Sequence, residues 1–275
     1  MKIIIDKQLQ DSCNVNLGCI FYNTIVEKNN ELWNYIDNIV IGNIKNEYTL
    51  DNLTEQINIK ASRQAYKKLG KEPSRYRVSS EALIRRILQN KGLYKINNVV
   101  DTNNLISLET GYSVGSYNLA KIQGDIIFRI GKEGEQYQGI GKELINIEKL
   151  PVFVDEIGPY GSPTSDSMRA MITEDSKEIL TVLISFNGKT GLEESVELAK
   201  NYLEKYANAE NVKSIIVWRI KKEIEDDPRT IAEPCIIEIF NKYFIWAWLI
   251  KWREKNKYKW KKIQNMEVFC SFLHI

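Results

Sequence analysis

Short apolar runs separated by glycines dominate the chain between residues 93 and 187, and this pattern limits the fold more than any other feature. The runs YKINNVVD, NLISLE, GDIIFRIG, ELINIEKL, VFVDEIG and EILTVLISFNG have the length and composition of β-strands. Helical patterns precede them, and one helix and a closing strand follow. Strands gathered in the middle of a chain, rather than alternating with helices, predict an α+β fold and not a doubly wound α/β sheet.

The predicted helices flank this strand-rich part. Apolar residues recur at helical spacing in NNELWNYIDNIVIGNI, which we expect to end near Gly42, and a second helix stops at Gly70. A third helix begins in SSEALIRRILQNKG, where Ser80 suits an N-cap, Glu81 suits the first turn and Gly92 suits the position after the last turn. The segment GLEESVELAKNYLEKYA predicts a fourth helix, while KIIID at the start and NVKSIIVWRI after that helix predict strands.

The composition argues against several kinds of catalytic site. The single histidine is His274, next to last in the chain, so we expect neither a zinc site nor a catalytic triad that depends on histidine. The four cysteines form no CxxC pair, and we interpret Cys13, Cys19, Cys235 and Cys270 as small buried residues or free thiols. No metal and no cofactor are expected. Acid–base chemistry would fall to carboxylates of the strand-rich part, namely Asp101, Glu109, Asp155, Asp166, Glu174 and Asp175.

Residues 225–275 differ in character from the rest of the chain, and we place a domain boundary near residue 225. Four of the six tryptophans lie there, interleaved with lysines. The apolar run 235–250 carries Glu238 and Lys242 and is too short to span a bilayer. Three interpretations stay open for it: a helix docked on the body or on a partner protein, a membrane-surface helix, or a nucleic-acid contact. The opening MKIIIDKQLQ does not fit a signal peptide, so a cytoplasmic location is the default expectation.

A local excess of cations is the clearest candidate binding surface in a chain whose formal net charge is only +2. Cations far outnumber anions between residues 67 and 91. The cations are Lys67, Lys68, Lys71, Arg75, Arg77, Arg85, Arg86 and Lys91, and the anions are Glu72 and Glu81. Three tyrosines lie among or beside them in the sequence: Tyr66, Tyr76 and Tyr94. Such a patch can neutralise phosphates of a nucleic acid. A solvated helix surface is the alternative interpretation.

Three blocks of sequence share their order and spacing with a known family: PSRYRVSSEALIRRIL, NNVVDTNNLISLETGYSVGSYNLAKIQGDIIFRIGKEGE and FVDEIGPYGSPTSDSMRAMITEDSKEILTVLISF. In the family, the middle block has a pattern of the type V-D-x-T-N-Y-V-x-L-E-x-G-x-P-x-H-A-F-D-L-D, followed by G-x-I-x-x-R and an acidic G-E turn. The residues of this chain that match the pattern are Val100, Asp101, Asn104, Leu108, Glu109, Gly111, Leu119, Gly124, Arg129, Gly134 and Glu135. The chain thereby resembles the tRNA-binding and editing domain in the β chain of bacterial phenylalanyl-tRNA synthetase, and free-standing proteins made mainly of that domain. The resemblance covers about residues 70–187. We therefore expect residues 1–224 to form this domain and 225–275 to be an extension of unknown role.

The resemblance implies a fold, a partner and an activity. The fold is an unusual β-sandwich-like core with flanking helices, and the partner is tRNA or aminoacyl-tRNA rather than DNA. The activity is hydrolysis of the ester in a wrongly charged tRNA, which makes the chain a candidate aminoacyl-tRNA deacylase. Such an ester is already activated, so holding it beside a positioned water supplies much of the acceleration. The alternative is a module that binds RNA, an amino acid or another small molecule on the same fold without turnover.

The resemblance also suggests site residues. Glu174 or Asp175 aligns with an acidic loop residue of the synthetase and would polarise the water. The substrate contacts would be Asn103, Asn104, Gly115, Ser116 and Arg169, and the RNA contacts Lys67, Lys68, Arg75, Arg77, Arg85 and Arg86. The chain departs from the pattern where Gly115 replaces a histidine and Asn103 replaces a threonine. We expect Gly115 to enlarge the pocket and to remove a polar group from it.

Overall fold

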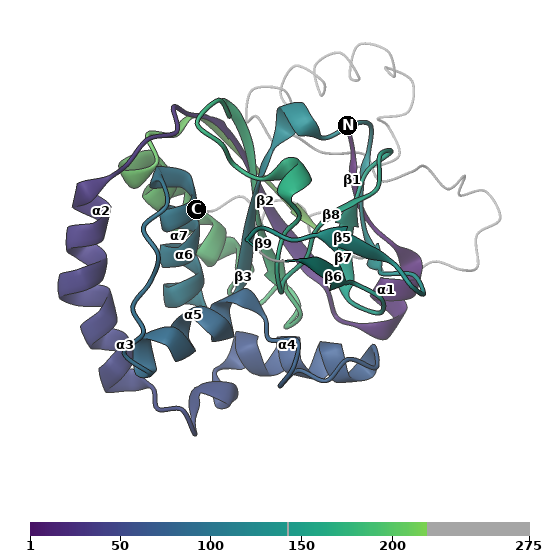
Figure 1. Ribbon diagram of the computed structural model, residues 1–275, viewed down its shortest axis with the longest axis horizontal. Helices are drawn as coiled ribbons and strands as arrows, with labels where there is room; N and C mark the ends of the chain where they lie inside the picture. The colour runs from purple at the N-terminus through teal and green to yellow at the C-terminus, as the bar shows by residue number, and fades with distance from the viewer. Residues whose placement is uncertain (142, 219–275) are drawn as a thin grey trace, which may run out of the picture. The chain divides into compact units, whose positions relative to one another are not determined.

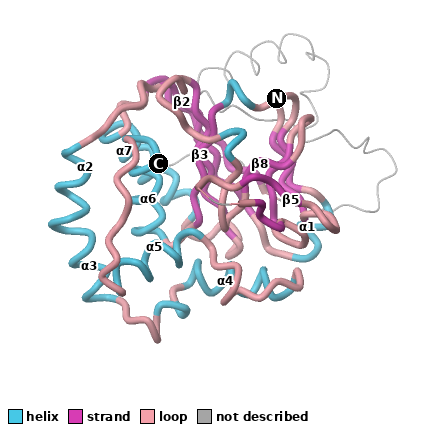
Figure 2. The backbone as a smooth tube through the Cα atoms, viewed as in Figure 1, coloured by secondary structure: helices cyan, strands magenta, loops and turns pink. Residues whose placement is uncertain are grey.

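The computed structural model describes residues 1–141 and 143–218 of the 275-residue chain (Figure 1). The predicted boundary near residue 225, the extension 225–275, Cys235, Cys270 and His274 lie outside the described residues. Within the described part, most helices lie to one side of the sheets, whereas the short helix α1 lies beside the strands (Figure 2). The predicted α+β class is confirmed.

The described strands form two four-stranded sheets and a two-stranded ribbon. In the first sheet, β1 (Ile3–Ile5) runs parallel to β4 (Ile126–Ile130), which is followed by antiparallel β7 (Pro151–Val154) and β8 (Pro159–Gly161). The second sheet is antiparallel throughout, in the order β10 (Glu210–Val217), β2 (Asn16–Asn23), β9 (Glu178–Ser185) and β3 (Ser113–Asn118). The ribbon pairs β5 (Gln136–Gln138) with β6 (Leu144–Asn146).

The two sheets share one apolar core, which gives the sandwich-like arrangement that the resemblance implied. Phe128 and Phe153 of the first sheet stack with their ring centroids 4.3 Å apart. Tyr117 of the second sheet meets Phe153 edge-on at 5.6 Å. Alternate side chains of β2 and β9 also belong to this core, as the period of a strand requires.

Helices cover the opposite face of the second sheet. Residues of α6 (Asn98–Thr110) and α7 (Leu192–Tyr206) pack there against Ile20, Val114 and Leu183. A further helical cluster lies outside α6 and consists of α2 (Asn30–Tyr35), a π-helical turn η1 (Ile36–Val40), α3 (Ile41–Glu47), η2 (Leu53–Glu55), α4 (Ile57–Lys68) and α5 (Ser79–Leu88) (Figure 1). The remaining short helices are α1 (Lys7–Ser12), η3 (Leu119–Lys121) and η4 (Met168–Ala170).

Two predicted strands, YKINNVVD and NLISLE, are wrong, because residues 98–110 form helix α6. The side chain of Asn97 caps this helix by accepting a hydrogen bond from the Val100 N–H at 2.9 Å. Gly111 ends it in the left-handed conformation at φ 73°. The helix is buried on most sides, polar residues such as Asp101 and Thr102 included, so its sequence lacks the one-sided apolar pattern of a surface helix.

The predicted ends of two other helices also need correction. Helical structure continues from α2 through η1 and α3, so Gly42 lies inside α3 rather than at its end. Helix α5 begins at Ser79 with Val78 in the capping position, and Ser80 is a buried residue of its first turn. The chain leaves α5 through Asn90 at φ 55°, two residues before Gly92. Gly70 does follow the end of α4, at φ 78°, as predicted.

Candidate functional site

The cations around α5 form an open hollow of about 390 Å³. The segment before the helix contributes Arg75 and Arg77, the helix contributes Arg85 and Arg86, and the turn after it contributes Lys91. Ala82, Gln89 and Thr164 complete the lining. A concave surface lined by four arginines and one lysine suits an anionic ligand.

Local packing fixes the walls of this hollow. Ile84 and Ile87 are buried in the helical cluster, which leaves the neighbouring Arg85 and Arg86 at the boundary with solvent. The Ser79 N–H donates to the Pro163 carbonyl oxygen at 2.7 Å and so ties the start of α5 to the segment that carries Thr164. Two segments that line the hollow are therefore joined by a backbone hydrogen bond.

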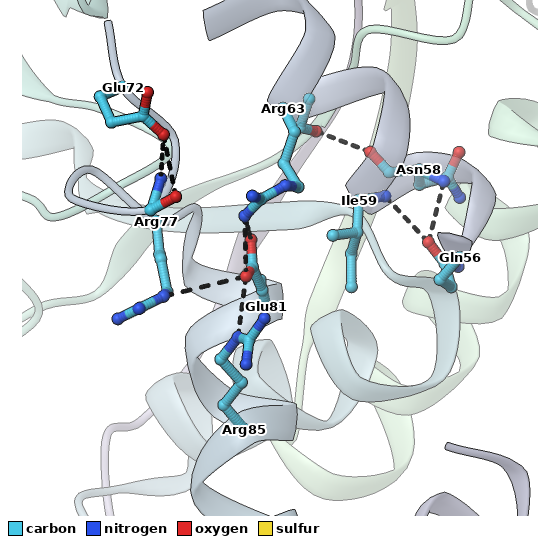
Figure 3. A network of polar contacts seen from close by, with 10 residues as sticks. Gln56, Asn58, Ile59, Arg63, Glu72, Arg77, Glu81 and Arg85 are labelled. Atoms are coloured by element: carbon cyan, nitrogen blue, oxygen red, sulfur yellow. Dashed lines mark hydrogen bonds and ion pairs between the residues drawn. The ribbon is translucent and has the colours of Figure 1, made fainter. Parts of the chain in front are cut away.

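Glu81, in the first turn of α5, is fully buried and binds several arginines at once (Figure 3). Its carboxylate accepts hydrogen bonds from Arg63 Nη1 at 2.9 and 3.0 Å and from Arg85 Nε at 2.8 Å. Arg77 Nε lies 3.9 Å from the same carboxylate. One buried negative charge thus orients three guanidinium groups, and the cluster keeps an excess of positive charge.

The other three cations of the hollow have no anionic partner of this kind. In residues 1–141 and 143–218, no carboxylate forms an ion pair with Arg75, Arg86 or Lys91. Arg86 instead donates to the backbone carbonyl oxygens of Lys91 and Gly92 at 3.3 and 3.0 Å. These three charges are available to an external anion.

The predicted RNA contacts are therefore only partly brought together. Arg75, Arg77, Arg85 and Arg86 all line the hollow. Lys67 and Lys68 are exposed in the last turn of α4 and are not lining residues.

The predicted substrate contacts do not form one pocket, because neighbouring residues of a strand point to opposite faces. Ser116 points to the face of β3 that carries Val114 and packs against α6 and α7, whereas Gly115 lies on the face that carries Tyr117 and joins the core between the sheets. The predicted enlargement of a pocket at Gly115 is not found. A Cβ atom on Gly115, or one on Gly161, would lie 2.4 Å from the Tyr117 hydroxyl oxygen, so the phenol of Tyr117 already fills that space.

Ser116 belongs to a buried chain of hydrogen bonds. Its hydroxyl lies 2.7 Å from that of Thr181 on β9 and donates to Asn103 Oδ1 on α6 at 3.2 Å. The Tyr22 hydroxyl on β2 continues the chain at 3.1 Å from Thr181. Asn103 also donates to the Val114 carbonyl oxygen at 2.9 Å, so the network ties α6 to the sheet. Sequence reasoning missed Thr181 and Tyr22, which resemble ordinary strand residues.

The remaining predicted site residues lie in other surroundings. Arg169 forms a bidentate ion pair with Asp155, in which Nη2 donates to Oδ1 at 2.8 Å and Nη1 donates to Oδ2 at 3.1 Å. Burial alone would raise the pKa of Asp155, but the Arg169 guanidinium and backbone N–H donors hold it below its ordinary value. Glu174 and Asp175 are exposed on the turn before β9, and Asn104 is half-buried on α6.

Asp166 is the acidic group with the most unusual surroundings. Its carboxylate accepts hydrogen bonds from the Tyr117 hydroxyl at 3.0 Å and from the Ser162 N–H at 3.1 Å. Burial raises its pKa to about 6, although these donors act in the opposite direction. The carboxylate thus acts as a structural hydrogen-bond acceptor that joins β3 to the loop after β8.

Neither a metal cluster nor a membrane span is found in the parts of the chain that the structure describes. Residues 1–141 and 143–218 contain no group of three or more His, Cys, Asp or Glu residues placed to hold a metal ion. No helix within the same residues has the length and apolar character needed to cross a bilayer. Cys13 and Cys19 are buried free thiols, as predicted.

Comparison with known proteins identifies the family. Residues 61–216 match the model of the B3/4 domain family, which is more than half of the chain. The chain belongs to the B3/4 domain family. The match encloses α5, the hollow and both sheets except for their N-terminal strands.

Curated relatives confirm the resemblance to the synthetase β chain. The chain is similar to the phenylalanine–tRNA ligase beta subunits of Aquifex aeolicus (32% identity over 110 residues), Bartonella quintana (38% over 68) and Idiomarina loihiensis (31% over 99). These matches cover 39%, 24% and 34% of this chain, and only 14%, 8% and 12% of the relatives. A crystal structure of an N-terminal fragment of the phenylalanyl-tRNA synthetase β-subunit from Pyrococcus horikoshii aligns with a TM-score of 0.38 and 12% identity, covering 77% of this chain and 50% of that one.

Proposed function

We propose that residues 1–224 form a tRNA-binding domain whose contact surface is the basic hollow around α5. The charges of Arg75, Arg86 and Lys91 carry this proposal, since these lining residues have no carboxylate partner in the described residues and are suited to phosphates. Membership of the B3/4 family and the similarity to phenylalanine–tRNA ligase beta subunits support tRNA as the nucleic acid.

The choice of test residues follows from the ion pairs. Arg77 and Arg85 compensate the buried charge of Glu81, so their removal would disturb the fold as well as the surface. Arg75 and Lys91 are exposed and have no carboxylate partner in the described part of the chain. Substituting these two residues tests the hollow without exposing the protein to an uncompensated buried charge.

The experiment measures tRNA affinity of the full-length protein by fluorescence anisotropy. The double variant R75Q/K91Q should bind tRNA at least about 10-fold more weakly, because two phosphate contacts are lost. The matched control K7Q/K28Q removes the same charge from exposed lysines outside the hollow and should stay within about twofold of wild type. Equal affinities for R75Q/K91Q and its control would contradict the proposal.

Hydrolysis of a mischarged aminoacyl ester is the second candidate function. Glu174 and Asp175 are exposed and form no ion pair with another residue in the described ranges, so their carboxylates can reach water at the surface. The filled space at Gly115 favours binding without turnover. A panel of correctly and wrongly charged tRNAs decides between them: a deacylase removes one mischarged amino acid and loses this activity in E174Q/D175N, whereas a binding module leaves the ester intact.

A further inference from the structure

The turn that follows α5 places an aromatic ring beside the hollow. The chain reverses at Asn90 and Gly92, whose φ angles are 55° and 64°. This reversal brings the carbonyl oxygens of Lys91 and Gly92 under the guanidinium of Arg86, and Arg86 Cζ then lies 4.3 Å from the centroid of the Tyr94 ring. Arg86 therefore both lines the hollow and contacts the ring of Tyr94.

Tyr94 is exposed to an unusual degree for a large aromatic side chain. It is 67% exposed, and it is held against Arg86 rather than against the apolar core. Tyr76, a second tyrosine near the hollow, differs. Tyr76 also lies near cations, with Lys71 Nζ 4.2 Å from its ring centroid, but it is half-buried and packs against the core between the sheets. Only the ring of Tyr94, of these two, has a broad surface open to a ligand.

We propose that Tyr94 and Arg86 form a stacking platform for an unpaired base, so that the hollow receives a single-stranded RNA segment rather than a helical stem. This inference rests on the proposed function and narrows its substrate class. Bases within an RNA helix are stacked on each other and are read through shape and phosphates, whereas an unpaired base can stack on an aromatic ring or a guanidinium plane. A base on Tyr94 would continue the stack that Arg86 begins, and its phosphates would lie within reach of Arg75, Arg86 and Lys91.

The test uses the full-length protein and three fluorescent RNA probes of equal phosphate number: a ten-nucleotide single strand, an abasic strand of the same length and a hairpin stem. The variant Y94A should bind the single strand about 5- to 160-fold more weakly, the range expected for loss of one stacked base. Its affinity for the abasic strand should be unchanged, because that probe has no base to stack. The control Y94F keeps the ring and should stay within about twofold of wild type on every probe.

The outcomes separate this inference from the proposed function. If Y94A weakens the abasic and the base-bearing strands equally, the ring only shapes the hollow and the platform is overturned. The platform also fails if Y94A changes nothing while R75Q/K91Q weakens all three probes, although phosphate binding by the hollow then stands. Wild-type binding to the hairpin that equals its binding to the single strand contradicts the substrate class. If the wild type binds neither these probes nor tRNA, both proposals fail.

Discussion

Replacing Glu81 by glutamine tests whether this buried carboxylate organises the arginines around α5. The carboxylate accepts three hydrogen bonds from Arg63 and Arg85, and hydrogen bonds of this charged kind contribute about 1.5–3 kcal/mol each. The carbonyl oxygen of glutamine, at the position of Glu81 Oε1, can still accept from Arg63 and Arg85, whereas the amide group at the position of Oε2 cannot accept. One hydrogen bond is therefore lost, and the other two lose their charged acceptor. The two arginine side chains are 20% and 22% exposed, and water partly replaces their lost partner. We therefore expect E81Q to lower the free energy of unfolding by about 3 kcal/mol.

Urea unfolding followed by far-ultraviolet circular dichroism measures this loss. A change of that size corresponds to a decrease in Tm of about 6–12 °C for a domain of this length. The matched control is E55Q, which breaks the Lys60–Glu55 pair, with N···O 2.6 Å and side chains 50% and 66% exposed. Because exposed pairs contribute little, E55Q should cost less than about 1 kcal/mol. If E81Q is no more destabilising than E55Q, the carboxylate does not hold the arginines in the way argued.

Three further predictions concern the core and α6, and urea unfolding checks each. G115A should lower the free energy of unfolding by about 1–3 kcal/mol, because its Cβ would lie 2.4 Å from the Tyr117 hydroxyl oxygen. In the control G42A the new Cβ meets nothing within 4 Å, so this variant should raise the free energy of unfolding by up to about 1 kcal/mol. Equal effects of the two substitutions would refute the packing argument. G111A should cost at least about 1 kcal/mol, since Gly111 ends α6 at φ 73°, and a neutral result would contradict that cap. Asp166 has a raised pKa of about 6, so its protonated form is favoured on folding, and the stability it contributes is complete below pH about 4 and lost as the pH rises through about 6. The free energy of unfolding of the wild type minus that of D166N should therefore fall by about 2–3 kcal/mol between pH 4 and pH 7. A difference that does not change with pH would refute the raised pKa of Asp166.

Much of the fold could be predicted because many elements bury one face. Strands β1 and β4 alternate between buried and less buried residues, and helix α7 follows the period of 3.6 residues. Strands β7 and β9 were predictable for another reason, because they are short apolar runs that are buried almost throughout. Helix α6 could not be predicted in this way. Its polar residues are buried beside its apolar ones, since Asn98 bonds to the backbone of Ile25 and Asp101 bonds to Trp33, so only the tertiary structure explains them.

The sequence predicted the part of the candidate site that depends on charge, but not the part that depends on three-dimensional packing. The cation-rich segment before and within α5 indicated the hollow, because charge density is visible in a sequence. The division of Gly115 and Ser116 between two faces would have followed from placing them in one strand. The filling of the space at Gly115 depends on the long-range packing of Tyr117 against Gly161, which no local pattern reveals.

The salt dependence of tRNA affinity tests the central claim most directly. Each neutralised phosphate contributes about 0.7–0.9 to the slope of log affinity against log salt, so R75Q/K91Q should lower the magnitude of that slope by about 1.5 relative to wild type. The control K7Q/K28Q should keep the wild-type slope, because these lysines are not part of the hollow. A smaller slope in R75Q/K91Q alone would establish phosphate contact at α5. Identical slopes in all three proteins would show that tRNA, if bound, lies elsewhere on the molecule.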